Sequence, residues 1–371
     1  MAALLVLGPI VLPECRDPKA GRLDLVSAGM SLVAVLMVDY GLKRVAQEGL
    51  DGTAALAMLA GVVLAAAFAR RQLTHPDPMV DLRLFRIRAF RVALAINVLG
   101  LFVAFGYFLF VAQYMQLVLA MSPLQAGVWS VPAGLGFIVG SQVGPRLLQR
   151  FRPATVIAGG LTMAAVGLAL LTKVSASRGL PLVVGSSVII SIGLAPVFGL
   201  TTELIVGSAP PERAGAASGI SETGAEFGGA LGISILGSIG VAVYRADVGG
   251  ALESVLTPDQ VSVAQDTLGG AAILSNTLPA DVAATLMSAA REAFVHGIHV
   301  TAALAGISAV VPAGLAIATL RRLRPRPGRR RRATAAAPMP NRTLPRLQRP
   351  QSPRPDEAGT TSQCQIRSRN E

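Results

Sequence analysis

The chain has 371 residues and a formal net charge of +12, with 52% hydrophobic but only 15% charged residues. Soluble domains usually carry about 25% charged residues, and here the hydrophobic residues form long uncharged blocks. Such blocks are typical of membrane-spanning helices, which are apolar on nearly all sides. The composition therefore excludes an ordinary soluble domain and indicates an all-α integral membrane protein.

A helix needs on the order of 20 apolar residues to cross a bilayer, and eight blocks of roughly this length follow one another. They cover residues 23–42, 53–69, 92–118, 127–145, 153–172, 180–202, 217–243 and 297–320. The apolar stretch 1–12 is too short to span, and it lacks the basic start and the cleavage site of a signal peptide. The sequence therefore predicts eight full transmembrane helices, with 1–12 as the end of a truncated one.

The arginines predict how these helices are oriented. Arginine-bearing segments occur at every second connection, namely 16–22, 70–91, 146–152, 213 and 321–332. Lysine and arginine are enriched in cytoplasmic loops, so we expect these connections and the C-terminus in the cytoplasm. Topology thus accounts for the positive charge, and no nucleic-acid partner is expected. The arginine-rich and alanine-rich composition is typical of a bacterial protein, which indicates the bacterial inner membrane.

Two hydrophilic regions complete the expected organisation. Residues 245–295 are expected to form an extracytoplasmic loop, in which the sequence TPDQ at 257–260 has the capping-box pattern of a helix start. Residues 321–371 are rich in Arg, Pro, Ser and Thr, and we expect a disordered basic cytoplasmic tail. The arginines at 321–332 are interpreted either as an anionic-lipid site or as a simple topology anchor.

Motifs of soluble enzymes are missing from the sequence. It contains no phosphate-binding glycine loop followed by Lys and Ser or Thr, no Cys-x-x-Cys and no His-Glu-x-x-His. Cys15 and Cys364 lie far apart, which argues against a disulfide framework. His296 and His299 have a metal-ligand spacing but no third ligand in view. We therefore predict a protein that is not an enzyme and that has no metal site and no cofactor.

Glycine recurs at four-residue spacing in two of the predicted helices. One stripe consists of Gly136, Gly140 and Gly144, and the other of Gly224, Gly228 and Gly232. Lipid supplies no hydrophobic force between helices, so small residues that let two backbones approach do much of the packing. We predict that both stripes are packing faces, and a functional extension is a pair of helices that slide or rock during transport.

Two carboxylates interrupt one of these helices. Glu222 and Glu226 are the only charged residues between Arg213 and Arg245, and on a helix they project within about 40° of each other, roughly opposite the glycines. A charge near the bilayer centre costs roughly 2.5–3.5 kcal/mol, so such residues usually face water or a partner. Both are candidates to bind a proton or a substrate. The alternative, a position among the cytoplasmic headgroups, applies more to Glu222 than to Glu226.

The helix that begins near residue 92 mixes amides with aromatic rings. Asn97, Gln113 and Gln116 are interleaved with Phe102, Phe105, Tyr107, Phe108, Phe110 and Tyr114. Such a mixture suits a cavity that binds amphiphilic, cationic molecules through rings and weak polar contacts. The alternative for the glutamines is hydrogen bonding to neighbouring helices. The three amides are therefore candidate substrate contacts.

A family resemblance rests on four segments, which are residues 80–91, 114–134, 140–151 and 210–232. These segments resemble the EmrB/QacA type of fourteen-helix drug:proton antiporters in the major facilitator superfamily. The resemblance implies a major facilitator-type helical bundle. Residues 13–88 then hold two linker transmembrane helices and a cytoplasmic loop, and residues 89–320 form the six-helix C-terminal transporter half.

The same resemblance places Arg146 and Arg150 in the second-half copy of the family's cytoplasmic loop motif. The family usually has glycine where this chain has Arg152. The family's first-half features, among them the acidic residue of the first helix and the Gly-Pro motif of helix five, are not in the sequence. We therefore expect a C-terminal portion that is incomplete alone. Three explanations stay open, namely a truncated gene, a mis-assigned start, or one half that needs a separate N-terminal half as its partner.

By resemblance, the function is proton-coupled multidrug efflux, in which the proton gradient is the energy source and lipophilic or cationic compounds are exported. The expected partners are the lipid bilayer, a small amphiphilic substrate and the N-terminal half. The alternative is a membrane remnant or scaffold that folds but does not transport.

Overall fold

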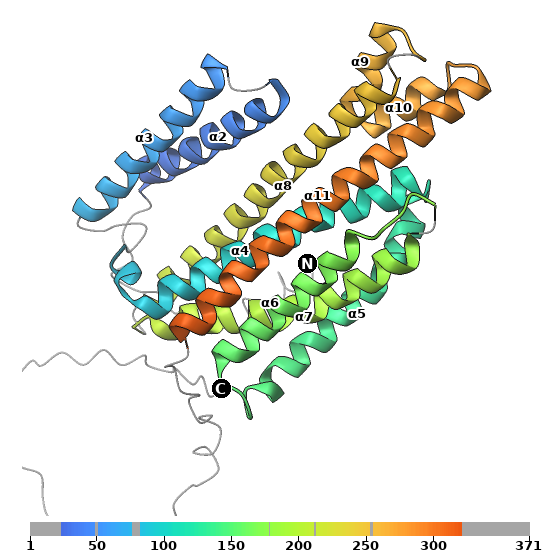
Figure 1. Cartoon of the computed structure of the whole chain (residues 1–371). Helices are drawn as coiled ribbons and strands as arrows, with labels where there is room; N and C mark the ends of the chain where they lie inside the picture. The colour runs from blue at the N-terminus through green and yellow to red at the C-terminus, as the bar shows by residue number, and fades with distance from the viewer. Residues whose placement is uncertain are drawn as a thin grey trace, which may run out of the picture. The chain divides into compact units, whose positions relative to one another are not determined.

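A computed structural model of the chain describes residues 24–48, 51–75, 82–177, 179–210, 213–252 and 255–320. These residues all belong to one compact unit, Asp24–Pro325. Within the described ranges the chain forms helices and turns and contains no strand (Figure 1). The all-α class expected from the composition is thereby confirmed. The features predicted at 1–12 and 321–371 lie outside the described residues.

Eight helices in the described ranges are long and apolar enough to cross a membrane, as predicted. They are α2 (Leu25–Glu48), α3 (Gly52–Thr74), α4 (Arg88–Gln113), α5 (Pro123–Leu147), α6 (Pro153–Leu171), α7 (Leu180–Ser208), α8 (Ala214–Leu252) and α11 (Ala280–Leu320). A 3₁₀ turn at Leu82–Arg86 precedes α4, and a π-helical turn at Tyr114–Val118 extends it. The short helices α9 (Pro258–Asp266) and α10 (Leu268–Ser275) lie between α8 and α11.

Two helices extend well past the blocks that hydropathy predicts. Helix α8 continues nine residues beyond its block, and α11 begins 17 residues before its block, so most of the region 245–295 is helical. These extensions bury apolar side chains such as Val248 and Leu286, which a hydropathy window does not detect. Helix α9 starts with the predicted capping box, in which Thr257 and Gln260 exchange side chain-to-backbone hydrogen bonds.

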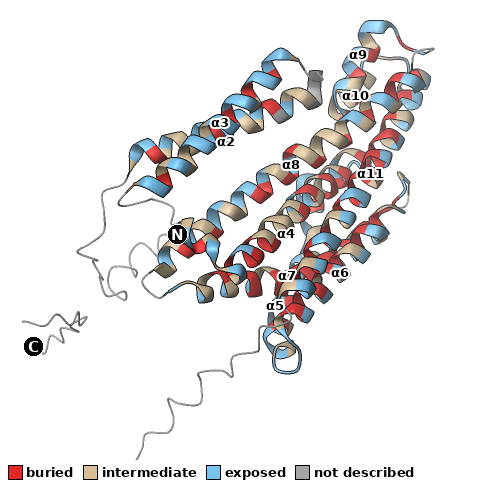
Figure 2. Ribbon diagram, turned by 60° about the vertical axis from the view of Figure 1, so that its left-hand side comes forward, coloured by how far each residue is buried: buried red, intermediate tan, exposed pale blue. Residues whose placement is uncertain are grey.

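Helices α4, α5, α6, α7, α8 and α11 pack into one bundle. Helix α7 contacts α4, α5 and α6, and α11 contacts α4, α6 and α8. The core between them is apolar and includes Ile96, Leu161, Leu168 and Ile190, each with an exposed fraction of 0%. Figure 2 shows that buried residues are frequent in α4, α6, α7 and α11, while α2 and α3 are mostly exposed.

Glycine allows α8 and α4 to approach until their backbones touch. The stripe Gly224, Gly228 and Gly232 faces α4, where the residues opposite are Leu94, Val98 and Phe102. A Cβ atom on Gly228 or Gly232 would collide with the carbonyl oxygen of Val98 or Phe102. Only glycine fits at these two positions, and because it has no side chain the two helix backbones can come into contact.

The second stripe joins α5 to α7 in the same way. Gly136, Gly140 and Gly144 face Val188, Ile192 and Pro196 of α7. A Cβ atom on Gly140 would lie 2.5 Å from the carbonyl oxygen of Ile192. Helix α5 is otherwise largely exposed, with apolar side chains such as Leu124 and Val128 on its surface. Its attachment to the bundle therefore depends on this stripe.

Helices α2 and α3 form a hairpin with an ion pair at each end. At one end Arg71 Nη2 lies 3.1 Å from the Asp24 carboxylate, which also accepts hydrogen bonds from the Ser27 hydroxyl and amide. At the other end Arg44 Nε donates to Asp51 over 2.9 Å. Both carboxylates lie just outside the membrane-spanning segments. A further ion pair, in which Lys43 Nζ lies 2.8 Å from the Asp39 carboxylate, is within α2.

Hydrogen bonds to these two carboxylates lower their pKa values. The pKa of Asp24 falls from 3.8 to about 2, chiefly because of the Ser27 hydroxyl, with Arg71 contributing less. The pKa of Asp51 falls to about 2, chiefly because of the Thr53 hydroxyl. A lowered folded-state pKa stabilises the hairpin above pH 3.8, and this stabilisation is lost as the pH falls toward 2.

We expect Gly228→Ala to destabilise the bundle by about 1–3 kcal/mol, because the new methyl group collides with the backbone of α4. Gly219→Ala on the same helix is the matched control, since a Cβ atom there meets no atom within 4 Å. Unfolding of the purified chain in detergent, followed by circular dichroism, measures both variants. Equal unfolding midpoints for the two variants would contradict the packing role of Gly228.

We also expect Ser27→Ala to raise the pKa of Asp24 toward 3.8, because the variant removes the principal hydrogen bond to that carboxylate. The part of the hairpin's stability that is lost between pH 3.8 and 2 should then shrink, because the folded-state and unfolded-state pKa values of Asp24 come closer together. Carbon-13 NMR of labelled aspartate carboxyls in detergent measures this pKa directly. Thr53→Ala is the control, and it should raise the pKa of Asp51 and leave that of Asp24 unchanged. An unchanged Asp24 pKa in Ser27→Ala would show that the hydroxyl is not the main cause.

Candidate functional site

Two adjoining hollows between α4, α5 and α7, of about 290 and 260 Å³, share four lining residues. Together they form what we call the aromatic groove. Its principal lining residues are Phe105, Tyr107, Phe108, Trp129, Ser130, Phe137, Ser187, Ser191 and Phe198. Cavities of this size accommodate small molecules, and sites for such ligands are usually apolar with a few polar groups.

Six of the sixteen residues that line this groove are aromatic. Phe105, Phe108 and Phe137 are 44%, 60% and 41% exposed, so their rings are available to a ligand. The rings of Phe137 and Phe198 lie against each other, with centroids 6.5 Å apart. Ring faces attract cations and ring surfaces bind apolar groups. The groove therefore suits molecules that combine an apolar body with positive charge.

Hydroxyl groups from α4 and α7 add a polar strip to the groove. The Tyr107 hydroxyl is hydrogen-bonded to the side chain of Ser191. The hydroxyl of Ser187 is buried, and no atom of the described residues is its hydrogen-bond partner. Buried polar groups are normally paired, so a ligand that donates or accepts a hydrogen bond at Ser187 would complete the site.

The three predicted amides do not line the groove. Asn97 is buried, and its side-chain nitrogen lies 3.4 Å from the Ser221 hydroxyl of α8, so it links two helices. Gln113 is half-buried. Gln116 is exposed and donates a long hydrogen bond to the carbonyl of Ala112 on its own helix. The structure therefore separates these amides from the aromatic rings with which the sequence interleaves them.

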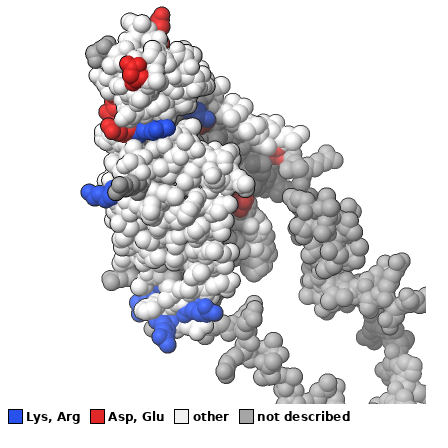
Figure 3. Space-filling model, turned by 90° about the vertical axis from the view of Figure 1, so that its right-hand side faces the viewer, with Lys and Arg blue, Asp and Glu red and all other residues white. Residues whose placement is uncertain are grey.

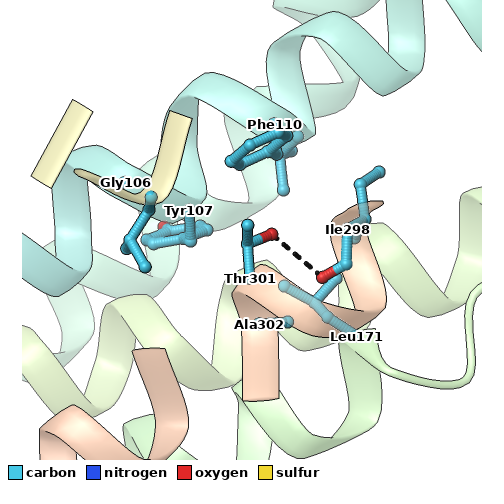
Figure 4. A pocket seen from close by; sticks show the side chains of 9 residues that line it. Gly106, Tyr107, Phe110, Leu171, Ile298, Thr301 and Ala302 are labelled. Carbon is cyan, nitrogen blue, oxygen red and sulfur yellow. Dashed lines mark hydrogen bonds between the residues drawn. The ribbon is translucent and has the colours of Figure 1, made fainter. Parts of the chain in front are cut away.

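The aromatic residues of α4 are divided between the groove and the core. Phe110 and Tyr114 are buried, and the Tyr114 hydroxyl donates to the carbonyl of Ser175 over 2.6 Å. Beside Phe110 lies a void of only about 10 Å³, where α4 meets α6 and α11 and where Thr301 donates to the carbonyl of Ile298 (Figure 4). One water molecule fills such a void, so it is too small for a substrate.

Glu222 and Glu226 are both exposed on α8. They project away from the glycine stripe that contacts α4, because their positions lie on the other side of the helix. The structure thus presents both carboxylates together on one surface of the described unit and apart from the groove-lining residues. Glu226 is four residues further into the apolar span than Glu222.

Arg146 and Arg150 are exposed where α5 ends and the turn toward α6 begins. On the face shown in Figure 3, one cluster of Lys and Arg side chains lies at the lower end of the bundle, and most Asp and Glu side chains lie toward the upper end together with other Lys and Arg side chains. Charged residues that lie at the two surfaces of a membrane produce such a distribution.

The two histidines on α11 bind different groups. His296 Nδ1 lies 2.6 Å from the Asp247 carboxylate of α8, and His299 Nε2 lies 2.7 Å from the carbonyl oxygen of Val174. Among the residues that the structure describes, no three His, Cys, Asp or Glu side chains gather closely enough to hold a metal ion.

Sequence reasoning missed the groove residues on α5 and α7. Trp129 and Phe137 sit in a helix that looks uniformly apolar, and no local pattern distinguishes them from lipid-facing residues. Ser187 and Ser191 offered a usable signal, since two hydroxyls four residues apart mark one face of an apolar helix. Their proximity to Tyr107 depends on the packing of α4 against α7.

The sequence model of the Major Facilitator Superfamily matches residues 25–233 of this chain. The multidrug efflux pump LfrA of Mycolicibacterium smegmatis is 35% identical over 319 residues, which cover 86% of this chain and 63% of LfrA. The tetracenomycin C resistance and export protein of Streptomyces glaucescens is 30% identical, over 85% of this chain and 60% of that protein. The methyl viologen resistance protein SmvA of Salmonella typhimurium is 28% identical, over 78% of this chain and 59% of SmvA.

This chain spans about three fifths of the length of these curated relatives. The family match covers more than half of the chain, and the structure supplies eight helices that are able to cross a membrane. The chain is therefore a multi-pass membrane protein that belongs to the major facilitator superfamily.

Proposed function

We propose that this chain is the C-terminal, substrate-binding part of a proton-coupled multidrug efflux transporter of the EmrB/QacA fourteen-helix type. The substrates are lipophilic or cationic compounds, which bind in the aromatic groove. The observation that carries the proposal is this groove, because rings from α4, α5 and α7 surround a volume suited to a small molecule. The names of the relatives, which refer to multidrug efflux and drug resistance, support export as the direction.

The chemistry of the groove favours loose selectivity. Its lining consists of aromatic, aliphatic and hydroxyl side chains, with no Asp, Glu, Lys or Arg among the lining residues of either hollow. Ring faces bind a cation without requiring one geometry, and the hydroxyls of Ser187 and Ser191 can pair with varied polar groups. A site built in this way accepts many amphiphilic molecules.

Proton coupling, in this proposal, uses the carboxylates of α8. Glu226 is exposed within a helix that is long and apolar enough to span the membrane. A charged carboxylate facing lipid is costly, so it must face water, face a partner or take up a proton. We infer that Glu226 binds the transported proton and that Glu222, nearer the helix start, supports it.

The proposal includes further helices that complete the transporter. The chain spans about three fifths of its relatives' length, and α5 exposes apolar side chains that include Leu124, Val131 and Leu135. An N-terminal half packed on α4, α5, α7 and α8 would enclose the groove between the two halves. We further propose that the chain lies in the bacterial inner membrane with its C-terminus in the cytoplasm, and the arginine-rich connections support this orientation.

Trp129 is the only tryptophan of the chain and lines the groove, so it reports on binding. We expect a saturable change of tryptophan fluorescence when the purified chain is titrated with ethidium. Phe137→Ala should weaken binding roughly fivefold, which corresponds to about 1 kcal/mol of lost ring contact. Val139→Ala, exposed on the same helix outside the groove, is the control. A fluorescence change that does not saturate would show that ethidium does not bind in the groove. Equal ethidium affinities of Phe137→Ala and Val139→Ala would show the same.

We expect Glu226→Gln to abolish efflux of ethidium from energised cells that carry the transporter containing this chain, because the amide cannot bind and release a proton. Glu222→Gln is the matched control and should reduce efflux less. Fluorescence of accumulated ethidium measures transport, and immunoblotting measures protein abundance. Full efflux by Glu226→Gln would exclude this residue as the proton site. If neither the unaltered chain nor any variant exports ethidium, the chain is better explained as a membrane scaffold that does not transport.

A further inference from the structure

A third hollow, of about 310 Å³, lies between α5, α6 and α7 and is separate from the aromatic groove. We call it the outer furrow. Its lining is almost wholly apolar and includes Val143, Leu147, Phe151, Gly159, Met163 and Ile192. Phe151 and Gly159 are exposed, so the furrow opens on the outside of the bundle.

The furrow follows from how three helices pack. Helices α5 and α6 both pack against α7 but make few contacts with each other, which leaves a channel above α7. Glycine deepens this channel, because Gly160 and Gly193 bring α6 and α7 together until a Cβ atom on Gly193 would lie 2.5 Å from the Gly160 carbonyl oxygen. A Cβ atom on Gly159 meets no atom within 4 Å, so the space above that residue is open.

Three arginines lie in the turn at one end of the furrow. Leu147 and Phe151 lie in or beside the turn that joins α5 to α6, and the same turn carries Arg146, Arg150 and Arg152, all exposed. Helix α6 begins there at Pro153, and no side chain caps its N-terminus, where the helix dipole is positive. Figure 3 shows basic side chains gathered at this end of the bundle. The furrow is therefore an apolar channel with a cationic mouth.

We propose that the outer furrow binds an anionic phospholipid, with one acyl chain lying along the furrow and the phosphate at the arginines of the α5–α6 turn. Lipid tails are as apolar as leucine, so burial alone does not select one lipid over another. Selection comes from the headgroup, because arginines near a membrane surface attract anionic lipid. A second copy of the chain fits less well, since a symmetric contact would bring the same arginines together.

Native mass spectrometry of the full chain in neutral detergent tests the proposal. The probes are phosphatidylglycerol and phosphatidylcholine with identical acyl chains. We expect at least tenfold preference for phosphatidylglycerol and one tightly held copy per chain. Gly159→Leu fills the furrow and should remove that copy. Gly185→Leu is the matched control, because Gly185 is also exposed and in open space, on α7 outside the furrow.

The double variant Arg146→Gln, Arg150→Gln tests the headgroup contact without touching the packed core. It should bind both lipids equally and weakly, with an unchanged unfolding temperature. Equal binding of the two lipids by the unaltered chain would overturn the proposal. So would retention of the phosphatidylglycerol by Gly159→Leu, or a dimer that Gly159→Leu dissociates, since a second copy would then occupy the furrow. If Gly159→Leu does not fold, unchanged lipid preference in the arginine variant overturns the proposal by itself.

Discussion

Close contact between helix backbones at glycine is the interaction on which the rest of this structure depends. In a bilayer, lipid surrounds apolar side chains as well as a neighbouring helix does, so helix association needs tight van der Waals contact. Gly228 and Gly232 bring α8 onto α4, and Gly140 brings α5 onto α7. The second contact fixes the distance between α5 and α7, which are two of the three helices that surround the aromatic groove.

The same packing separates the chemistry of the chain into distinct regions. The groove contains rings and hydroxyls, whereas the carboxylates of Glu222 and Glu226 are exposed on α8, a helix that contributes no lining residue to the groove. Ion pairs such as Asp24–Arg71 and Arg44–Asp51 lie at helix ends, where water and headgroups solvate them. This separation suits the proposed export of lipophilic cations, because a fixed charge beside the substrate would narrow the range of compounds that the groove accepts.

The sequence was sufficient to predict the membrane helices. Long uncharged blocks have no stable alternative to a spanning helix, and all eight predicted spans are present. The helix ends were less predictable, because α8 and α11 continue wherever residues such as Val248 and Leu286 find a buried contact. Such contacts depend on the tertiary structure, and a hydropathy average along the sequence does not detect them.

The groove was only partly predictable from the sequence. The rings of α4 indicated an aromatic site, and Phe105, Tyr107 and Phe108 do line the groove. Helical rotation turns Phe110 and Tyr114 of the same helix into the core, and the interleaving of residues in the sequence does not reveal this division. The contribution of Ser187 and Phe137 comes from helices that are remote in sequence and that meet α4 only in the folded bundle.

The most direct test of this account is whether the aromatic groove lies on the water-filled substrate pathway. Phe108→Cys, introduced into a transporter in which Cys15 and Cys364 are replaced, can be treated with a membrane-impermeant charged maleimide in everted membrane vesicles. Ile307→Cys, exposed on α11 away from the groove, serves as the lipid-facing comparison. The account predicts that Phe108→Cys reacts, that ethidium slows this reaction, and that Ile307→Cys stays unreactive. A Phe108→Cys that is as unreactive as Ile307→Cys, or one that ethidium does not protect, would contradict it.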